Sequence, residues 1–511
     1  MKFRKLKKWL LRISSILMLI LIAGLFFANY ELKKMFGAYT DVVDTSQLDV
    51  VPTPTTITNI SILSPDGNRF IENQTVRIDK GKIISIDSLN KVPTAQLIIN
   101  GEGKYLIPGL VDAHVHTWQS PNDLLLYVAN GVTHIREMMG SPEHLKWRQE
   151  IEEGRRLGPK MFVASNKIQS FKPLKGWFMN WSQGNINLNK SDKAFPTLKN
   201  LSTQGYDAIK IGTFLSKDTY KALSAEIDKI DLPLIGHIPI SINLEEFWLS
   251  NQKEVAHIEE FVKALNREFG YYNKENADEF LEFVKERSNE IANNLLKHKI
   301  TVVSTLGLTE SFLRQKFDLD KLLKTVQLSY VNPGITEGTI LTSRALGWLP
   351  KVNLYRLPKN LNPEEVSGIK IFWDTYVKAH QIILKALAEN GVQVLAGTDS
   401  NIPVMTPGFA LHNELKSLTQ SGMSPSQALR SATAAPANRM KIKSGKILPN
   451  HRADLIILNK NPLKNIENTK TIETVILKGK VFNRTQLDAI LNAVKKANDK
   501  SRTTDITSYV E

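Results

Sequence analysis

Eight short apolar segments alternate with helical patterns between residues 110 and 397, and this alternation constrains the fold more than any other feature. Helical patterns such as 276–298 and 374–390 lie between most of the segments. Such a repeat predicts an α/β fold, a (β/α)8 TIM-type barrel. An open doubly wound sheet is the alternative, but we find no glycine fingerprint of the kind that it requires. The predicted strands are 110–116, 132–138, 160–165, 207–212, 233–238, 254–258, 300–305 and 392–397.

A different pattern flanks the barrel segment on both sides. Between 56 and 107, short β-rich runs separated by turns predict antiparallel hairpins, and a similar pattern returns after residue 435. We therefore expect residues 56–107 and 436–484 to build one small β-sandwich domain beside a barrel at 108–435. Residues 485–511 are charged and polar, which predicts a tail.

The N-terminus has the composition of a targeting segment. Its first twelve residues carry six lysines and arginines and no acid, and Ile13 to Ala28 runs without a charge. This pattern predicts that residues 1–30 are a signal peptide or a transmembrane signal anchor, followed by a linker at 31–55. The poor cleavage site around Phe27 favours the uncleaved anchor. The basic flank should stay in the cytoplasm, so we expect an exported protein, either membrane-anchored or periplasmic or extracellular.

Composition excludes several functions. The chain has no cysteine, which removes disulfides, thiolate ligands and a cysteine nucleophile. Its net charge is +15, but much of it lies in the first twelve residues, and no basic helix with interleaved aromatic residues indicates nucleic-acid binding.

Two insertions interrupt the repeat, at 166–200 and 306–370. Loops that follow barrel strands lie on the catalytic face, so each insertion is either a lid or substrate wall, or plain surface elaboration. The first holds Trp177, Trp181 and six lysines against one aspartate. That composition suits an anionic substrate with an apolar part.

Candidate metal ligands cluster at the ends of the predicted strands. His114 and His116 are two apart in a strand, so their imidazoles point to the same side and can share one metal ion. The carboxyl ends of barrel strands form the active-site face. The residues that we expect to meet there are His114, His116, Lys210, His237, His257 and Asp399.

Other charged and aromatic residues have less specific interpretations. Arg136 ends the second predicted strand, where it either holds a substrate carboxylate or braces the barrel through a buried ion pair. The remaining histidines divide into two groups by context. We expect structural or supporting roles for His134, His380 and His412, and surface positions for His144, His298 and His451.

The order of these motifs resembles the metal-dependent amidohydrolase superfamily, in its imidazolonepropionase and prolidase-related branch. The resemblance covers residues 56 to about 484 and includes PGLVDAHVH (108–116), AGTDS (396–400) and GKILPNHRADLIILNKNPL (445–463). It implies that His114 and His116 bind one metal, that a carboxylated Lys210 bridges two metals, and that His237 and His257 hold the second. Asp399 would be both a ligand and the proton shuttle.

The resemblance implies a metal-dependent hydrolase of carbon–nitrogen bonds, acting on a dipeptide, an N-acyl amino acid or a cyclic amide. A hydroxide bridging two zinc ions would attack the amide, although a single metal stays open. A mononuclear deaminase or ester hydrolase is the alternative, but deaminases of the superfamily usually carry a glutamate where this chain has Ile240. A catalytically dead, membrane-tethered binding protein is a third hypothesis. Besides a small-molecule substrate, the membrane and a second copy of the chain are the partners considered.

Overall fold

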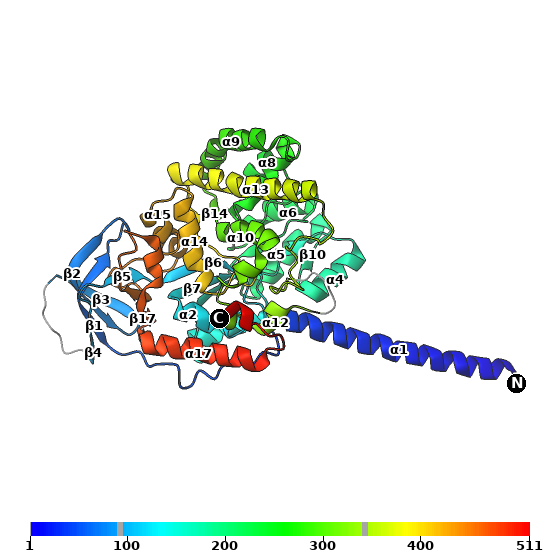
Figure 1. The fold of residues 1–511 in the computed structure, drawn as a ribbon, viewed down its shortest axis with the longest axis horizontal. Helices are drawn as coiled ribbons and strands as arrows, with labels where there is room; N and C mark the ends of the chain where they lie inside the picture. The colour runs from blue at the N-terminus through cyan, green and yellow to red at the C-terminus, as the bar shows by residue number, and fades with distance from the viewer. Residues whose placement is uncertain (1, 89–95, 340–345, 511) are drawn as a thin grey trace.

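The computed structural model describes residues 2–88, 96–339 and 346–510. Figure 1 shows a β-rich part at one end, a larger part of mixed strands and helices, and the long helix α1 (Lys2–Met35) projecting from the opposite side. Within the described residues, α1 contains the one segment long and apolar enough to cross a membrane, and its apolar window is exposed. An N-terminal apolar helix is therefore confirmed.

All eight predicted strands of the repeat are present, each within a few residues of the expected bounds. Every neighbouring pair is parallel, and the strands pair in the orders β6-β7-β8 and β11-β12-β13-β14-β15. Their bounds are β6 (Leu110–Val115), β7 (Val132–Glu137), β8 (Lys160–Val163), β11 (Ile209–Ile211), β12 (Leu234–Gly236), β13 (Gln252–Val255), β14 (Thr301–Val303) and β15 (Val394–Leu395).

Isolated bridges connect the two parallel sheets at both of their edges. Ala164, just after β8, pairs with Ala208 before β11, and Val115 at the end of β6 pairs with Ser400 beyond β15. A backbone hydrogen bond of 2.9 Å from Ala113 N to Ala396 O strengthens the second junction. The eight strands thus follow one another in cyclic order, although the regular ladders stop at these two junctions.

Helices follow the strands, as the repeat predicts. The expected helix at 276–298 is α9, whereas the one expected at 374–390 begins earlier, because Asn362 caps it and Pro363 occupies its first position. The helices of the repeat are α2 (Asp123–Ala129), α3 (Pro142–Glu152), α5 (Ala194–Thr203), α6 (Lys217–Glu226), η2 (Ile227–Lys229), α7 (Leu244–Trp248), α8 (Glu259–Phe269), α9 (Ala277–His298), α13 (Pro363–Glu389), α14 (Phe409–Gln420), α15 (Pro425–Ser431) and α16 (Ala434–Arg439).

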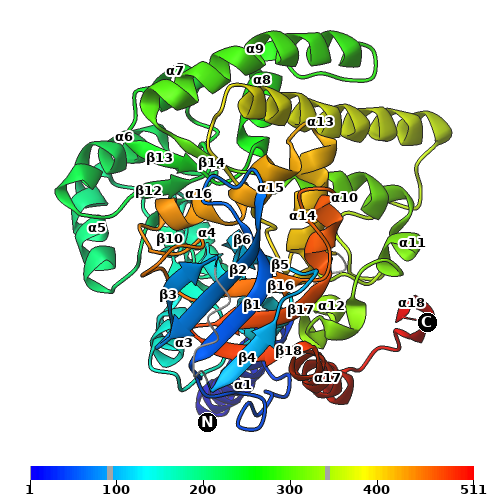
Figure 2. The ribbon, with the colours of Figure 1, turned by 90° about the vertical axis from the view of Figure 1, so that its left-hand side faces the viewer.

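Strands from both flanks of the barrel segment combine in one eight-stranded sheet (Figure 2). β5 pairs in parallel with β1 and antiparallel with β16, so it joins the early strands to the late ones. The order is β18-β17-β16-β5-β1-β2-β3, with β4 also on β1. The bounds are β1 (Thr55–Leu63), β2 (Phe70–Asp79), β3 (Lys82–Asp87), β4 (Leu97–Asn100), β5 (Tyr105–Pro108), β16 (Leu455–Leu458), β17 (Ile472–Leu477) and β18 (Lys480–Asn483).

The two insertions fold into short elements on the side where the strands end. Residues 340–345 of the second insertion lie outside the described residues. The first insertion contributes β9 (Ile168–Gln169), α4 (Pro173–Gln183), β10 (Ile186–Asn187) and η1 (Ser191–Lys193) before α5. The second contributes α10 (Leu306–Phe317), α11 (Leu319–Leu323), η3 (Leu328–Tyr330) and α12 (Pro333–Glu337).

The predicted polar tail is wrong as a description of residues 485–511. Most of the segment forms the helix α17 (Arg484–Ser501), which packs against α2. Leu487, Ile490 and Val494 are buried, because they recur at helical spacing and make one apolar face despite the charged residues between them. Beyond β16 the chain also contains η4 (Ile466–Lys470) and α18 (Thr507–Val510).

Candidate metal centre

The structure brings all six predicted ligands together at the carboxyl ends of the parallel strands. His114 lies on β6 and Lys210 on β11, while the other four follow the ends of β6, β12, β13 and β15. Parallel strands of cyclic order point their carboxyl ends at one place, which explains why residues so distant in sequence meet. The six are His114, His116, Lys210, His237, His257 and Asp399.

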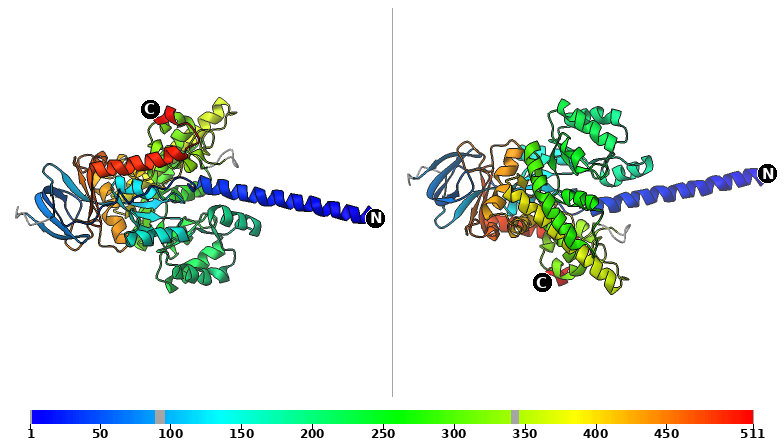
Figure 3. Two further views of the ribbon diagram at one scale, coloured as in Figure 1. Left: turned by 90° about the horizontal axis from the view of Figure 1, so that it is seen from below. Right: turned by 90° about the horizontal axis from the view of Figure 1, so that it is seen from above.

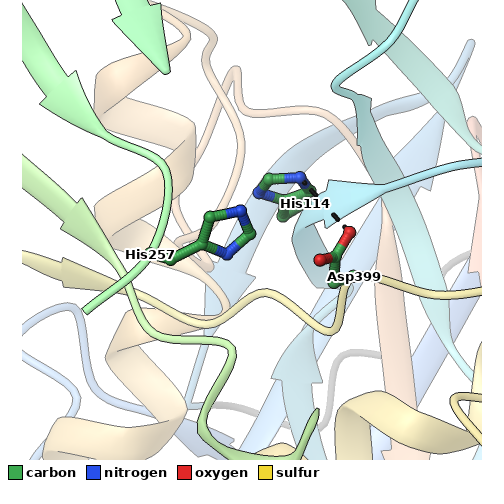
Figure 4. A group of neighbouring side chains, drawn as sticks. All are labelled: His114, His257 and Asp399. Carbon is green, nitrogen blue, oxygen red and sulfur yellow. Dashed lines mark ion pairs between the residues drawn. The ribbon is translucent and has the colours of Figure 1, made fainter. Parts of the chain in front are cut away.

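Asp399 occupies the middle of the cluster. Its Oδ1 lies 3.0 Å from His116 Nε2 and 3.5 Å from His114 Nε2. Donor atoms of His114, His257 and Asp399 all lie within 4.8 Å of one another (Figure 4). The ring of His237 follows at 5.2 Å from that of His257, and Lys210 Nζ lies 3.2 Å from His114 Nε2.

The outer nitrogen of each imidazole faces a fixed oxygen. This arrangement orients the rings and leaves Nε2 of each for the centre of the cluster. The contacts are His114 Nδ1 to Ala256 O at 3.3 Å, His116 Nδ1 to Glu137 Oε1 at 3.6 Å, His237 Nδ1 to Glu260 Oε1 at 2.9 Å and His257 Nδ1 to Thr305 Oγ1 at 2.9 Å.

Contacts between β6 and the segment that follows β15 also position Asp399. The buried carboxylate of Asp112 accepts hydrogen bonds from Thr398 N at 3.0 Å and from Thr398 Oγ1 at 2.6 Å. Asp399 itself has a positive φ of 55° and donates its backbone N–H to His114 O at 2.8 Å. A non-glycine residue in this region is strained, and such strain often accompanies functional sites.

Burial sets the charge of the candidate nitrogen ligands. It lowers the pKa of His257 to about 3 and holds the pKa of His114 and His237 well below the ordinary value, so these imidazoles are neutral. Burial, with Lys167 nearby, lowers the pKa of Lys210 to about 7. The Lys210 amine is thus far easier to deprotonate near neutral pH than an exposed lysine, which carboxylation requires.

The carboxylate stays ionised in the same surroundings. Burial alone would raise the pKa of Asp399, but its interactions with His114, with His116, whose own pKa is raised, and with His257 hold it well below its ordinary value. Its Oδ1 is buried and makes no hydrogen bond of good geometry within the described residues, although His116 Nε2 lies 3.0 Å away. Buried imidazoles gathered around an ionised carboxylate form a donor set that fits a divalent metal.

Arg136 does not project into this cluster as a free cation. It is buried and pairs with Glu254 on β13, whose other oxygen lies 3.1 Å from Arg439 Nε. Its guanidinium also lies 4.9 Å from the ring centre of Phe162. Of the two roles left open by the sequence, the geometry corresponds to bracing the barrel, and the expected contact with a substrate carboxylate has no support.

Several residues around the cluster were not predicted. Glu137 ends β7 and accepts hydrogen bonds from Thr117 N and Oγ1 at 2.7 and 2.6 Å, beside His116. Lys167 follows β8, and its pKa is lowered by burial while the charge of Asp399 opposes that shift. Glu137 could have been found from its place at a strand end, next to Arg136.

His144 corrects another expectation. It was expected at the surface, but it is buried, and its Nε2 lies 2.7 Å from Trp118 O in the chain just after His116. By contrast, His412 has the expected structural environment, because its two ring nitrogens contact Thr469 Oγ1 and Asn130 O.

Comparison with known families identifies the chain. The sequence pattern described as "Amidohydrolase family" matches residues 208–482, more than half of the 511 residues. The chain belongs to the amidohydrolase family. The expectation of a hydrolase acting on carbon–nitrogen bonds is confirmed at this level, and the family implies a TIM barrel with an accompanying sandwich. In the search of curated proteins, no sequence matches this chain.

Solved structures share the fold of this amidohydrolase. A bottromycin amidohydrolase is 19% identical with a TM-score of 0.67, covering 92% of this chain and 96% of that one. A protein described as a putative prolidase from Bifidobacterium longum is 19% identical with a TM-score of 0.60, covering 87% and 100%. A prolidase complexed with N-methylphosphonate-L-proline is 17% identical with a TM-score of 0.59, covering 84% and 100%.

The matched region contains only part of the candidate centre. Lys210, His237, His257 and Asp399 lie inside residues 208–482, whereas His114 and His116 precede them. Geometry joins His114 and His116 to the rest, since both rings contact Asp399.

Proposed function

We propose that this amidohydrolase cleaves a carbon–nitrogen bond in a small amide, such as a dipeptide, an N-acyl amino acid or a cyclic amide. The observation that carries the proposal is the convergence of four imidazoles, one lysine amine and one carboxylate at the same strand ends. Dipeptides gain support because proteins of the same fold are described as prolidases and as a Xaa-Pro dipeptidase.

The scaffold of the proposed site is a closed (β/α)8 barrel at residues 108–435, with the sheet domain completed by 436–484. The cyclic strand order and the bridges at Ala164 and Val115 support closure. Closure brings β6 beside β15, and this neighbourhood is required for His114 and Asp399 to act together.

The cluster would hold divalent metal through its own donors. His114 and His116 would bind one ion, His237 and His257 a second, with Asp399 and a carboxylated Lys210 as the anionic ligands. Two zinc ions would satisfy this donor set. When bound, such metals polarise a carbonyl oxygen and lower the pKa of water.

The side chains of the chain supply proton transfer and orientation. Asp399 is ionised, so its carboxylate can accept a proton and deliver it to the leaving nitrogen. Lys210 can attack carbon dioxide when its amine is neutral, forming an N–C bond and releasing one proton, which yields an anionic carbamate. Glu260 and Thr305 keep the rings of His237 and His257 turned toward the centre.

Metal content tests the arrangement directly. Purified protein should contain about two equivalents of divalent metal, because two donor groups and a bridging anion are available. Lys210→Ala should lose most of one equivalent, and added short carboxylates should restore part of it. Lys253→Ala, an exposed lysine on β13, is the matched control. An unchanged metal content in Lys210→Ala would contradict the carbamate. One equivalent of metal in the wild-type protein would favour the mononuclear alternative, and a metal-free wild-type protein would favour a binding protein.

Substrate class is tested by turnover. A panel of dipeptides, N-acyl amino acids and lactams should contain at least one substrate whose hydrolysis stops when metal is removed by a chelator and returns with zinc. Hydrolysis of phosphoesters or carboxylic esters alone would overturn the proposal.

The proposal also includes anchoring of the enzyme to a membrane by α1. Helix α1 is exposed along its apolar stretch and has lysines and arginines at its N-terminal end, which supports an uncleaved anchor with the catalytic part exported. Extraction of the full chain by detergent but not by high salt or alkali would support this anchoring, and release by salt alone would contradict it.

A further inference from the structure

Helix α4 carries its apolar side chains on the outside. Leu174 is 80% exposed, Trp177 59% and Phe178 49%, and the ring of Trp181 stacks on Trp177 at 6.0 Å. These positions follow the i, i+3, i+4, i+7 spacing, so they share one face of the helix. The buried positions are instead small, namely Gly176 and Ser182. This distribution is the reverse of that expected for a helix whose apolar face packs on its own domain.

Cations lie beside this face. Lys172 and Lys175 are exposed, and the Lys175 ammonium lies 4.8 Å from the ring centre of Phe171 and 5.6 Å from that of Phe214. The helix itself contains no acidic residue. We call Leu174, Lys175, Trp177, Phe178 and Trp181 the α4 surface. Aromatic rings with lysines beside them match the boundary between anionic lipid headgroups and acyl chains.

The α4 surface lies on the side of the molecule from which α1 projects. Figures 1 and 3 show α4 reaching outward in the direction of α1, beyond the point where α1 leaves the remainder of the structure. The order of the elements also places α4 on the face where the candidate ligands lie, because the helix follows the carboxyl end of β8.

The residues that follow α1 directly, Phe36 and Gly37, are docked on this same face. Gln119 donates its backbone N–H to Phe36 O at 2.9 Å, and the Phe36 ring meets Trp118 edge-on at 5.2 Å. Trp118 in turn stacks on His116, with ring centres 6.4 Å apart. Asn332 also donates to Gly37 O at 3.0 Å. These contacts fix the direction in which the helix leaves the catalytic face.

We propose that the α4 surface rests in the lipid interface of the membrane that α1 crosses, so that the mouth of the metal centre opens toward the headgroups. This inference rests on the proposed anchoring by α1. The substrate of the proposed hydrolysis would then be taken from the membrane boundary, and an amide carrying an apolar group fits that position. A second copy of the chain is the competing occupant, but the adjacent anchor and the lysines favour lipid.

Single-cysteine labelling tests the arrangement, because the natural chain has no cysteine. Full-length Leu174→Cys, Leu19→Cys and Leu249→Cys are each labelled with an environment-sensitive dye and reconstituted in phosphatidylcholine–phosphatidylglycerol vesicles, with and without brominated acyl chains. Leu249 is the matched control, since it is 86% exposed and precedes β13 at the end of the barrel away from the ligands. Leu19 lies in the apolar stretch of α1 and reports anchoring.

Dye at positions 19 and 174 should emit further to the blue and lose about half of its intensity to brominated lipid, while dye at 249 should not respond. Quenching at 19 without quenching at 174 would overturn the lipid contact of α4 and leave the anchor intact. No quenching at 19 would overturn the anchoring. A blue shift at 174 that persists in detergent and ignores bromine would assign the surface to a second copy, contradicting the inference.

Discussion

At the scale of single residues, Asp399 combines an ionised carboxylate with a buried oxygen that lies within 3.5 Å of two imidazoles. Asp399→Asn keeps the size of the side chain but removes the charge and the proton acceptor. Turnover should fall about 10³-fold, the magnitude of general acid–base catalysis, with little change in thermal unfolding. Steady-state kinetics and circular dichroism measure both quantities.

Asp192→Asn is the control for this change, because Asp192 is exposed in the first insertion. It should leave turnover unaltered. If Asp399→Asn kept wild-type kcat, the assignment of Asp399 as proton carrier would fail.

Buried histidines away from the candidate metal centre make stability depend on pH. Burial lowers the pKa of His412 to about 4, so the unfolded chain takes up a proton near pH 6.5 while the native state stays neutral. Stability due to this residue is therefore present at pH 8 and is lost as pH falls below 6.5, by about 2 kcal/mol at pH 5.

His412→Gln tests that dependence. The variant should be less stable than wild type at pH 8, because His412 contacts both Thr469 and Asn130. Denaturant titrations should show a smaller loss of unfolding free energy between pH 8 and pH 5 than in wild type. Equal losses in both proteins would mean that His412 does not contribute to the acid sensitivity.

At the scale of elements, α17 shows how a charged sequence can hold a structural face. Leu487, Ile490 and Val494 are fully buried where α17 packs. Leu487→Ala removes buried methyl groups and leaves a cavity, so the unfolding free energy should fall by about 3 kcal/mol. Lys496→Ala, exposed on the same helix, should change it little. Equal melting temperatures for the two variants would show that α17 contributes no stability.

Local patterns account for what the sequence predicts well. Each strand of the repeat is a short apolar run, and the six candidate ligands follow because parallel strands end at one face. Partners at long range were not predictable in the same way. Whether Arg136 faces substrate or protein depends on Glu254 across the barrel, and the burial of His144 depends on Trp118. The face of α17 was present in the spacing of its apolar residues, but its charged residues obscured it.

At the scale of the whole molecule, the apolar stretch of α1, the proposed membrane anchor, is separate from the part that carries the candidate metal centre. The apolar stretch of α1 contacts little of the chain, whereas residues from Phe36 onward contact the end of β6 and α12. A chain beginning at Glu31 should therefore be soluble without detergent, fold with its metal complement and hydrolyse a water-soluble amide with wild-type kcat. Gel filtration, metal analysis and kinetics measure these properties. Since Phe36, Gly37 and Trp118 remain, His116 keeps its neighbours in the truncated protein. An aggregated or metal-free product would mean that residues 1–30 belong to the folded core, and the separation of anchor from catalyst would be wrong.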